Sequence, residues 1–384
     1  MYGFHRDAHF RYRFQRDRRW AAIQSPLSES EYGLAGRSHL NDSNFSRDQR
    51  QLQQKGTAET MSYAIVLRDT GGPEKLRYES VNVADPGPGE LQIRHTAIGV
   101  NFHDTYVRSG LYDTLKLPGI PGLEAAAIVE KVGPSVAGFT AGDRIAYIDA
   151  SYGAYSERRI LSASLALRLP SSVSDEAAAS LTIKGFTACM LLRRVHQVRV
   201  GETLLIHAAA GGVGQPLVRW AKHLGATVIA TVGSEEKAAI ARECGADHVV
   251  LYRRENFAER VAKITGGNGV EVVYDSVGAD TFNGSLECLS YFGTLVNFGQ
   301  SSGPVSPFAI SRLAAKSNGI VRPMLFHYIR GRAALEAMAH ESYEAMDKGI
   351  IRSEVRLRLP LSRAGEAHMQ LESRTTIGPI VLVP

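Results

Sequence analysis

Cysteine is scarce in this sequence of 384 residues. The three cysteines, Cys189, Cys244 and Cys288, lie far apart and form no CxxC pair. So few cysteines exclude a disulfide framework and a structural zinc site made of four cysteines. The scarcity is typical of proteins in a reducing compartment, so we expect a cytoplasmic protein.

Long hydrophobic runs and a strong charge excess are missing as well. No stretch approaches the ~18 consecutive apolar residues that a membrane helix needs, so we expect no membrane partner. The formal net charge is only +5. Residues 1–60 hold ten Lys/Arg against seven Asp/Glu, which is more than half of this excess. A basic binding face elsewhere in the chain is therefore not indicated, and a nucleic-acid partner is disfavoured.

The first 60 residues also lack an apolar periodicity. Their arginine-rich start, FHRDAHFRYRFQRDRRW, has no apolar core like that of a secretory signal peptide. We interpret residues 1–60 as a disordered N-terminal extension, with the folded protein beginning at Met61. A basic arm that binds RNA is the alternative interpretation.

The rest of the chain shows two textures. Residues 61–184 contain β-branched runs such as ELQIRHTAIGV, separated by turn signals such as DPGPGE, and predict a mainly β domain. Residues 185–325 alternate strand-like runs with helical stretches, in which Ser234 and Asn256 are the expected N-caps. This alternation predicts an α/β fold with a doubly wound parallel sheet and ligands at the carboxyl ends of its strands. We expect the strands within residues 326–384 to rejoin the first domain.

The segment IHAAAGGVGQ nearly matches the dinucleotide-binding pattern G-x-G-x-x-G, with Ala209 in place of the first glycine. Gly211 and Gly214 keep the roles that matter most, which are backbone approach to a pyrophosphate and close packing of the helix. Gly212 adds room, and the helix after Val213 offers free N–H groups to phosphate. The segment therefore predicts a dinucleotide site, with a purely structural turn as the alternative.

The end of the next strand, TVGSEEK, lacks the acidic residue that holds the ribose hydroxyls in NAD sites. Ser234 offers a hydroxyl, Lys237 a positive charge, and Tyr252 closes the neighbouring strand. Hydroxyl groups and a lysine suit a 2′-phosphate, so the sequence predicts NADP. In the alternative interpretation, Glu235 or Glu236 replaces the missing acid and the cofactor is NAD.

The motifs of both halves occur together in a known family. HAAAGGVGQ, TVGSEEK, VVYDSVG and VNFGQSSGPV, with GVNFHDTYVRSGLY and PGIPGLEAAAIVEKVG before them, make the chain resemble the zeta-crystallin-like quinone oxidoreductases of the medium-chain dehydrogenase/reductase superfamily. The resemblance runs from Met61 to Pro384. It implies a GroES-like catalytic domain, a Rossmann domain, and a homodimer joined at the edge of the Rossmann sheet.

The resemblance also bears on metal binding. Zinc alcohol dehydrogenases of the same superfamily use a cysteine and a His–Glu pair in the first domain. Asn101 stands at the cysteine place and Leu123 at the histidine place. Neither residue type is a zinc ligand, so we expect no metal. We interpret the nearby His103 as a surface or packing residue.

Our hypothesis for the catalytic residues is that Asn101, Tyr106 and Tyr112 orient the nicotinamide and the substrate. Arg322 would help to stabilise negative charge on oxygen, and the alternative for Tyr112 is a lid or packing residue. The implied cofactor contacts are Asn101, Tyr106, Gly211, Gly212, Val213, Gly214, Gly233, Ser234, Lys237, Tyr252, Ser276, Val277, Phe298, Gly299, Ser301, Val321, Arg322, Pro323 and Arg374. In KGFTACMLL, Met190 stands where an aromatic residue near the nicotinamide is expected.

A site without a Lewis acid favours acceptors that are already electron-poor. We therefore expect an NADPH-dependent quinone reductase, in which the cofactor carries the chemistry and the protein orients it. One alternative is a 2-alkenal or enone reductase that adds hydride to a conjugated C=C bond. An alternative from another class is an NADPH- and RNA-binding protein with little turnover, suggested only by the basic N-terminal segment.

Overall fold

The computed structural model describes residues 60–373 and 377–384. All of them belong to one compact unit, Thr57–Pro384. The expected disordered extension, apart from Thr60, lies outside the described residues. Arg374, one of the expected cofactor contacts, lies outside them as well.

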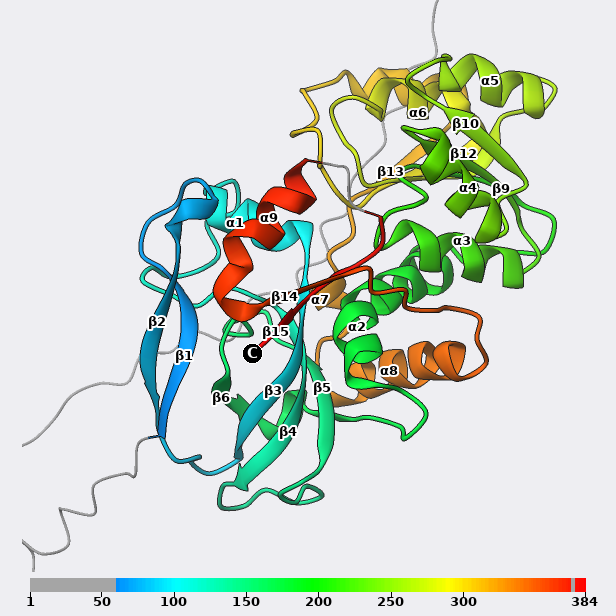
Figure 1. The fold of residues 1–384 in the computed structure, drawn as a ribbon. Helices are drawn as coiled ribbons and strands as arrows, with labels where there is room; N and C mark the ends of the chain where they lie inside the picture. The colour runs from blue at the N-terminus through cyan, green and yellow to red at the C-terminus, as the bar shows by residue number, and fades with distance from the viewer. Residues whose placement is uncertain (1–59, 374–376) are drawn as a thin grey trace, which may run out of the picture. The chain divides into compact units, whose positions relative to one another are not determined.

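A seven-stranded sheet combines the first part of the chain with two strands from its end (Figure 1). β15 pairs antiparallel with β3 and parallel with β14. β3 also pairs with β4 and with β6. β1 and β2 form a separate antiparallel pair. The strands of this part are β1 (Thr60–Leu67), β2 (Leu76–Val83), β3 (Glu90–Val100), β4 (Glu124–Val132), β5 (Arg144–Ile148), β6 (Arg158–Ser162), β7 (Leu167–Arg168), β14 (Leu357–Pro360) and β15 (Ile380–Val383).

A six-stranded sheet follows the order β10-β9-β8-β11-β12-β13. All of its pairings are parallel, as the alternating texture predicts. The order reverses between β8 and β11, and ligands bind at such a switch point in open α/β sheets. The strands are β8 (Thr203–Ile206), β9 (Thr227–Val232), β10 (His248–Leu251), β11 (Val270–Asp275), β12 (Leu289–Asn297) and β13 (Gly319–Val321).

The helices agree with the sequence where local signals are strong. Ser234 and Asn256 are N-caps whose side chains accept backbone N–H groups, as predicted. The helix that follows Val100 was not predicted, because its eight residues are too few for a sustained period. The helices are α1 (Phe102–Ser109), α2 (Asp175–Met190), α3 (Gly214–His223), α4 (Glu235–Glu243), α5 (Phe257–Ile264), α6 (Phe282–Cys288), α7 (Leu325–Tyr328), α8 (Arg332–Asp347) and α9 (Ala364–Glu372).

Helix α2 packs against the seven-stranded sheet and against helices α3 and α8. Ala178 and Ala179, near its start, join a small core with residues of the seven-stranded sheet. Phe186, further along, belongs to the large core that also holds strands and helices of the six-stranded sheet. Met190 is buried in that same core. A side chain in the middle of α2 therefore lies between the seven-stranded sheet and this second core.

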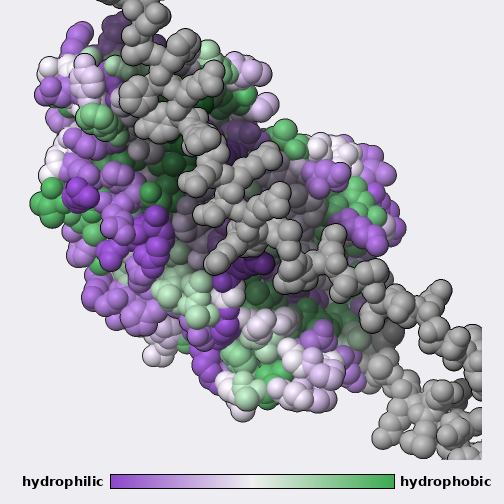
Figure 2. Space-filling view, turned by 180° about the vertical axis from the view of Figure 1, so that it is seen from behind, coloured by the Kyte–Doolittle hydropathy of each residue, from purple (hydrophilic) through white to green (hydrophobic). Residues whose placement is uncertain are grey.

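Among the described residues, no helix is long and apolar enough to cross a membrane. On the face of the molecule in Figure 2, hydrophobic residues form small patches among hydrophilic ones.

Candidate functional site

The glycine-rich turn joins β8 to α3 and has the geometry that its glycines require. A Cβ on Gly214 would lie 2.3 Å from the carbonyl oxygen of Ala208, so only glycine lets the helix pack so closely on the turn. Val213 is the N-cap of α3, as predicted. The left-handed φ of this turn falls on Ala208, at 51°, and not on Ala209. Alanine at the first glycine place is therefore compatible with the turn.

The end of β9 forms the adenosine end of the predicted cofactor site. The Ser234 hydroxyl accepts the Lys237 N–H at 3.3 Å, so its own O–H remains a donor beside the start of α4. Tyr252 lies over Gly233, since a Cβ on Gly233 would be 2.7 Å from the tyrosine hydroxyl. The Glu235 carboxylate bonds the Arg254 guanidinium at 2.7 Å. Because Glu235 already has this partner, a 2′-phosphate is favoured over ribose hydroxyls held by Glu235.

The loops after β11 and β12 interlock. The Asp275 carboxylate accepts the N–H of Val277 at 2.7 Å, and the Phe298 N–H donates to the Asp275 carbonyl at 2.8 Å. A Cβ on Gly299 would lie 2.6 Å from the Ser276 carbonyl oxygen, which receives the Ser301 N–H at 3.2 Å. The structure thus brings together five residues expected to contact the cofactor: Ser276, Val277, Phe298, Gly299 and Ser301.

Tyr112 and Arg322, far apart in sequence, also meet. The tyrosine hydroxyl receives an N–H of Arg322 at 3.4 Å and one of Gln300 at 3.3 Å. The Arg322 guanidinium is fixed by the Gly299 carbonyl at 2.9 Å and by Asn297. The arginine follows β13, which ends at Val321, and precedes Pro323. This contact links the loop after α1 to the ends of β12 and β13.

Aromatic rings surround Tyr112. Its ring meets that of Tyr106 edge-on with centroids 5.1 Å apart, and that of His103 at 5.2 Å. His103 Nε2 also bonds the Tyr152 hydroxyl at 2.9 Å. Burial lowers the pKa of His103 to about 4, so the ring is neutral at physiological pH. These contacts fit the packing role expected for His103.

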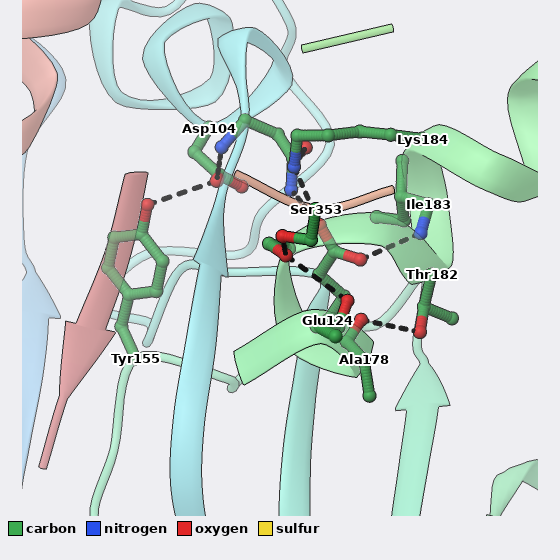
Figure 3. A network of polar contacts seen from close by, with 11 residues as sticks. Asp104, Glu124, Tyr155, Ala178, Thr182, Ile183, Lys184 and Ser353 are labelled. Atoms are coloured by element: carbon green, nitrogen blue, oxygen red, sulfur yellow. Dashed lines mark hydrogen bonds and ion pairs between the residues drawn. The ribbon is translucent and has the colours of Figure 1, made fainter. Parts of the chain in front are cut away.

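The predicted nicotinamide end contains Asn101, the N-cap of α1. The Asn101 Nδ2 donates to Glu124 Oε1 at 2.9 Å, and Lys184 Nζ donates to Asn101 Oδ1 at 2.9 Å. Lys184 Nζ also bonds Glu124 Oε1 at 3.1 Å, and Glu124 Oε2 accepts the Ile183 N–H at 2.7 Å (Figure 3). Sequence reasoning missed Glu124 and Lys184. The signal was a lone lysine within the apolar helix run that contains KGFTACMLL.

A second buried chain of polar groups starts at Asp104, one helical turn from Asn101. Its Oδ2 accepts the Asn101 backbone N–H at 2.8 Å and the Tyr155 hydroxyl at 3.0 Å (Figure 3). The Tyr155 hydroxyl lies 3.1 Å from His368 Nε2 in α9. Burial raises the pKa of the Asp104 carboxyl to about 7. The start of α1 is therefore anchored to the C-terminal part of the chain.

Under the glycine-rich turn lies a buried network that the sequence did not predict. His207, directly after β8, bonds the Thr231 hydroxyl at 2.8 Å and the Ser285 hydroxyl at 2.9 Å. The Ser285 hydroxyl donates to Asp275 at 3.3 Å. Burial lowers the pKa of His207. The network ties the ends of β8, β9 and β11 together, which holds the glycine-rich turn in place.

The donor set near Asn101 does not fit a zinc ion. Leu123 packs against Val107 and Tyr152, and an ammonium rather than a metal ligand faces Asn101 and Glu124. Within residues 60–373 and 377–384, no three His, Cys, Asp or Glu side chains gather as a metal site would require.

Comparison with known proteins agrees with this geometry. The model of zinc-binding dehydrogenases matches residues 212–340, and that of the alcohol dehydrogenase GroES-like domain matches residues 87–171. A quinone oxidoreductase of Pseudomonas aeruginosa is 45% identical over 325 residues, which are 84% of this chain and 100% of that protein. A 2-haloacrylate reductase of a Burkholderia species is 44% identical over 331 residues, which are 84% of this chain and 99% of that protein.

A solved structure shows the same arrangement. Escherichia coli quinone oxidoreductase complexed with NADPH matches with a TM-score of 0.82 and 44% identity, over 84% of this chain and 100% of that one. The GroES-like and Rossmann folds are therefore both present. The chain belongs to the quinone oxidoreductases of the zinc-binding dehydrogenase superfamily.

Proposed function

We propose that this protein is an NADPH-dependent quinone reductase. The observation that carries the proposal is the match to quinone oxidoreductases along their whole length, with the Asn101 amide, bonded to the Lys184 ammonium, where zinc dehydrogenases have a metal ligand. NADPH supplies a hydride, which converts the quinone to a hydroquinone anion, and a proton from solvent completes the hydroquinone.

The protein's own residues bind and orient the reactants. Gly211, Gly212, Val213 and Gly214 leave room and N–H groups for the pyrophosphate, because the helix dipole and free amides of α3 favour an anion. The loops after β11, β12 and β13 flank the cofactor with Ser276, Val277, Phe298, Gly299, Ser301, Val321, Arg322 and Pro323. Arg374 completes the proposed set from outside the described residues.

Gly233, Ser234, Lys237 and Tyr252 form the proposed 2′-phosphate site at the end of β9. At the other end, Asn101, Tyr106, Tyr112 and Arg322 hold the nicotinamide and the acceptor. Arg322 is fixed by carbonyl oxygens, so its charge is oriented in advance toward an oxygen that becomes negative.

The proposal is tested by steady-state kinetics with 1,4-benzoquinone. We expect turnover with NADPH and a kcat/KM at least ten-fold lower with NADH. Absence of quinone turnover with either cofactor would refute the proposal.

A second candidate substrate class is favoured by the similarity to 2-haloacrylate reductase. In that case the hydride adds to a C=C bond conjugated to a carboxylate or carbonyl. Turnover of 2-chloroacrylate or a short 2-alkenal is compared with that of 1,4-benzoquinone at saturating NADPH. A higher kcat/KM for the alkene would make the protein an enoyl-type reductase instead.

We also propose a homodimer that forms across the edge of the six-stranded sheet. In the described part of the chain, β13 pairs with β12 alone. Nearby segments expose large apolar side chains, with Phe292 at 79% and Ile310 at 78%. Sedimentation of the protein and of Ile310→Asp tests the proposal, because a charge in a two-fold interface is repeated and should yield monomers. A wild-type monomer would refute it.

Two further proposals concern organisation and location. The catalytic domain comprises residues 61–184 completed by 326–384, and the Rossmann domain residues 185–325. The first boundary falls inside α2, in keeping with its contacts to the seven-stranded sheet and to α3. Three free and buried cysteines support a cytoplasmic location.

A further inference from the structure

Lys184 is a buried cation in the middle of α2. Only 6% of its side chain is exposed, and its partner Glu124 is fully buried. Removing such charges from water costs free energy that their mutual attraction offsets only with good geometry, and apolar replacements of similar volume are often neutral or stabilising. The pair is therefore weakly explained by stability, and its position beside Asn101 suggests another role.

The two charged groups fix the orientation of the Asn101 amide. Lys184 Nζ has only N–H donors, so the atom that faces it at 2.9 Å must be the amide oxygen. Glu124 Oε1 is an acceptor, so the atom that faces it at 2.9 Å must be the amide nitrogen. One N–H of Asn101 then remains for a ligand. Asn101 is thereby set as a hydrogen-bond donor.

Glu124 is itself fixed by the backbone. Its other oxygen, Oε2, accepts the Ile183 N–H at 2.7 Å, so the carboxylate cannot rotate away without leaving that donor unpaired (Figure 3). The chain Ile183–Glu124–Asn101–Lys184 closes on itself within one turn of α2. Each member constrains the next.

The stem of Lys184 also reaches the glycine-rich turn. A Cβ on Gly212 would lie 3.0 Å from Lys184 Cε and 3.2 Å from Cδ. The third N–H of the ammonium makes no hydrogen bond with the described residues. One side chain thus connects the start of α1 to the turn beneath the proposed pyrophosphate site.

We propose that Lys184 is a positioning residue for hydride transfer: with Glu124 it locks Asn101 as a donor to the nicotinamide end of the cofactor. The inference rests on the proposed NADPH-dependent function. It places a fixed ammonium beside Asn101, which stands at the place of the cysteine ligand of zinc dehydrogenases. It implies that Lys184 governs the rate of hydride transfer more than NADPH affinity, because its ammonium bonds Asn101 and Glu124. The stem that packs against Gly212 keeps its length up to Cε when lysine is replaced by methionine.

A neutral version of the Glu124–Lys184 pair should reverse the orientation of the Asn101 amide. In Glu124→Gln with Lys184→Met, the Ile183 N–H still requires an acceptor, so the amide oxygen of the introduced glutamine turns to it. The NH₂ group of that glutamine then faces Asn101, whose amide must turn its oxygen inward and present the opposite hydrogen-bond pattern to the cofactor. This double variant leaves no buried charge unpaired, so it tests positioning without the loss of stability that either single change would cause.

The experiment compares four proteins: wild type, the double variant, Asn101→Ser and the triple variant that combines them. Hydride transfer is measured in single turnovers with NADPH and 1,4-benzoquinone, and NADPH affinity by fluorescence titration. Lys222→Met is the matched control, because Lys222 bonds Asp247 on the surface.

We expect the double variant to transfer hydride at least ten-fold more slowly, with less than a three-fold change in NADPH dissociation constant and an altered emission of the bound nicotinamide. In the Asn101→Ser background the same two changes should slow transfer less than two-fold, since the residue they orient is gone. A double variant with the wild-type rate and emission, or a full effect without Asn101, would overturn the inference.

Failure of the proposed function has a different signature. A wild-type protein that binds NADPH but does not reduce quinone would refute the reductase proposal. The emission of bound NADPH in wild type and double variant would still decide whether Lys184 positions the nicotinamide.

Discussion

The two ends of the proposed cofactor site are constructed in opposite ways. At the nicotinamide end, the polar groups of Asn101, Glu124 and Lys184 are buried and bonded to one another. At the adenosine end, Tyr252 is 45% exposed and the Ser234 hydroxyl caps a helix at the surface. The contrast indicates that the buried end controls the orientation of the nicotinamide, because small errors of geometry there slow the reaction. The exposed end contributes charge and affinity for the cofactor.

The largest expected effect comes from breaking the buried end. Glu124→Ala leaves the Lys184 ammonium without its carboxylate and the Ile183 N–H without an acceptor. We expect the free energy of unfolding to fall by about 3–5 kcal/mol. Urea denaturation measures it, with Glu243→Ala as the control because that carboxylate forms an exposed ion pair with Arg219. Equal losses in the two variants would contradict the contrast between buried and exposed pairs.

Asp104 makes the buried end sensitive to pH. Burial raises its pKa from 3.8 to about 7, so the native carboxyl keeps its proton to a higher pH than the unfolded one. Its contribution is full below about pH 4 and is lost as pH rises through about 7, because the native state binds more protons in that window.

Asp104→Asn cannot titrate and should remove this dependence. The difference in unfolding free energy between wild type and variant should change by a few kcal/mol across the window. A histidine with a lowered pKa outside this network, such as His95, titrates in both proteins and cancels in the difference. Parallel stability curves would show that Asp104 is ionised in the fold at acid pH.

The exposed end should respond in affinity alone. Lys237→Glu places a negative charge against the proposed 2′-phosphate, and we expect NADPH to bind about 10–100-fold more weakly, with NADH binding little changed. Titrations with both cofactors measure this, and Lys263→Glu in α5 is the control for net charge. An unchanged preference for NADPH would remove Lys237 from the phosphate site.

The smallest effect is expected at Tyr112, which lies at the nicotinamide end but outside the buried network of Asn101, Glu124 and Lys184. Tyr112→Phe removes a hydroxyl whose contacts with Arg322 and Gln300 are long, at 3.4 and 3.3 Å, but keeps the ring that packs on Tyr106. We expect kcat to fall about two- to five-fold, because hydrogen bonds this long contribute only about 0.5–1 kcal/mol. A loss of a hundred-fold in kcat would instead indicate that the hydroxyl contacts the reacting atoms.

Much of the fold could be predicted from local signals in the sequence. The glycine-rich turn, the caps at Ser234 and Asn256 and the parallel strands are each indicated by residues that lie close together in the sequence. The pairing of Glu124 with Lys184 does not, because it joins a strand to a helix that lies 60 positions further along the chain. A lysine in an apolar helix signals a buried partner, but only the tertiary structure identifies it.

The C-terminal strand has a consequence for how the protein is made. β15 is held between β3 and β14, so the first sheet has a gap until that strand arrives. During synthesis, residues 203–321 of the six-stranded sheet emerge long before β15. We therefore expect the six-stranded sheet to fold first, while the end of β3 at residues 98–100 stays open to chaperones or to other chains for most of that time.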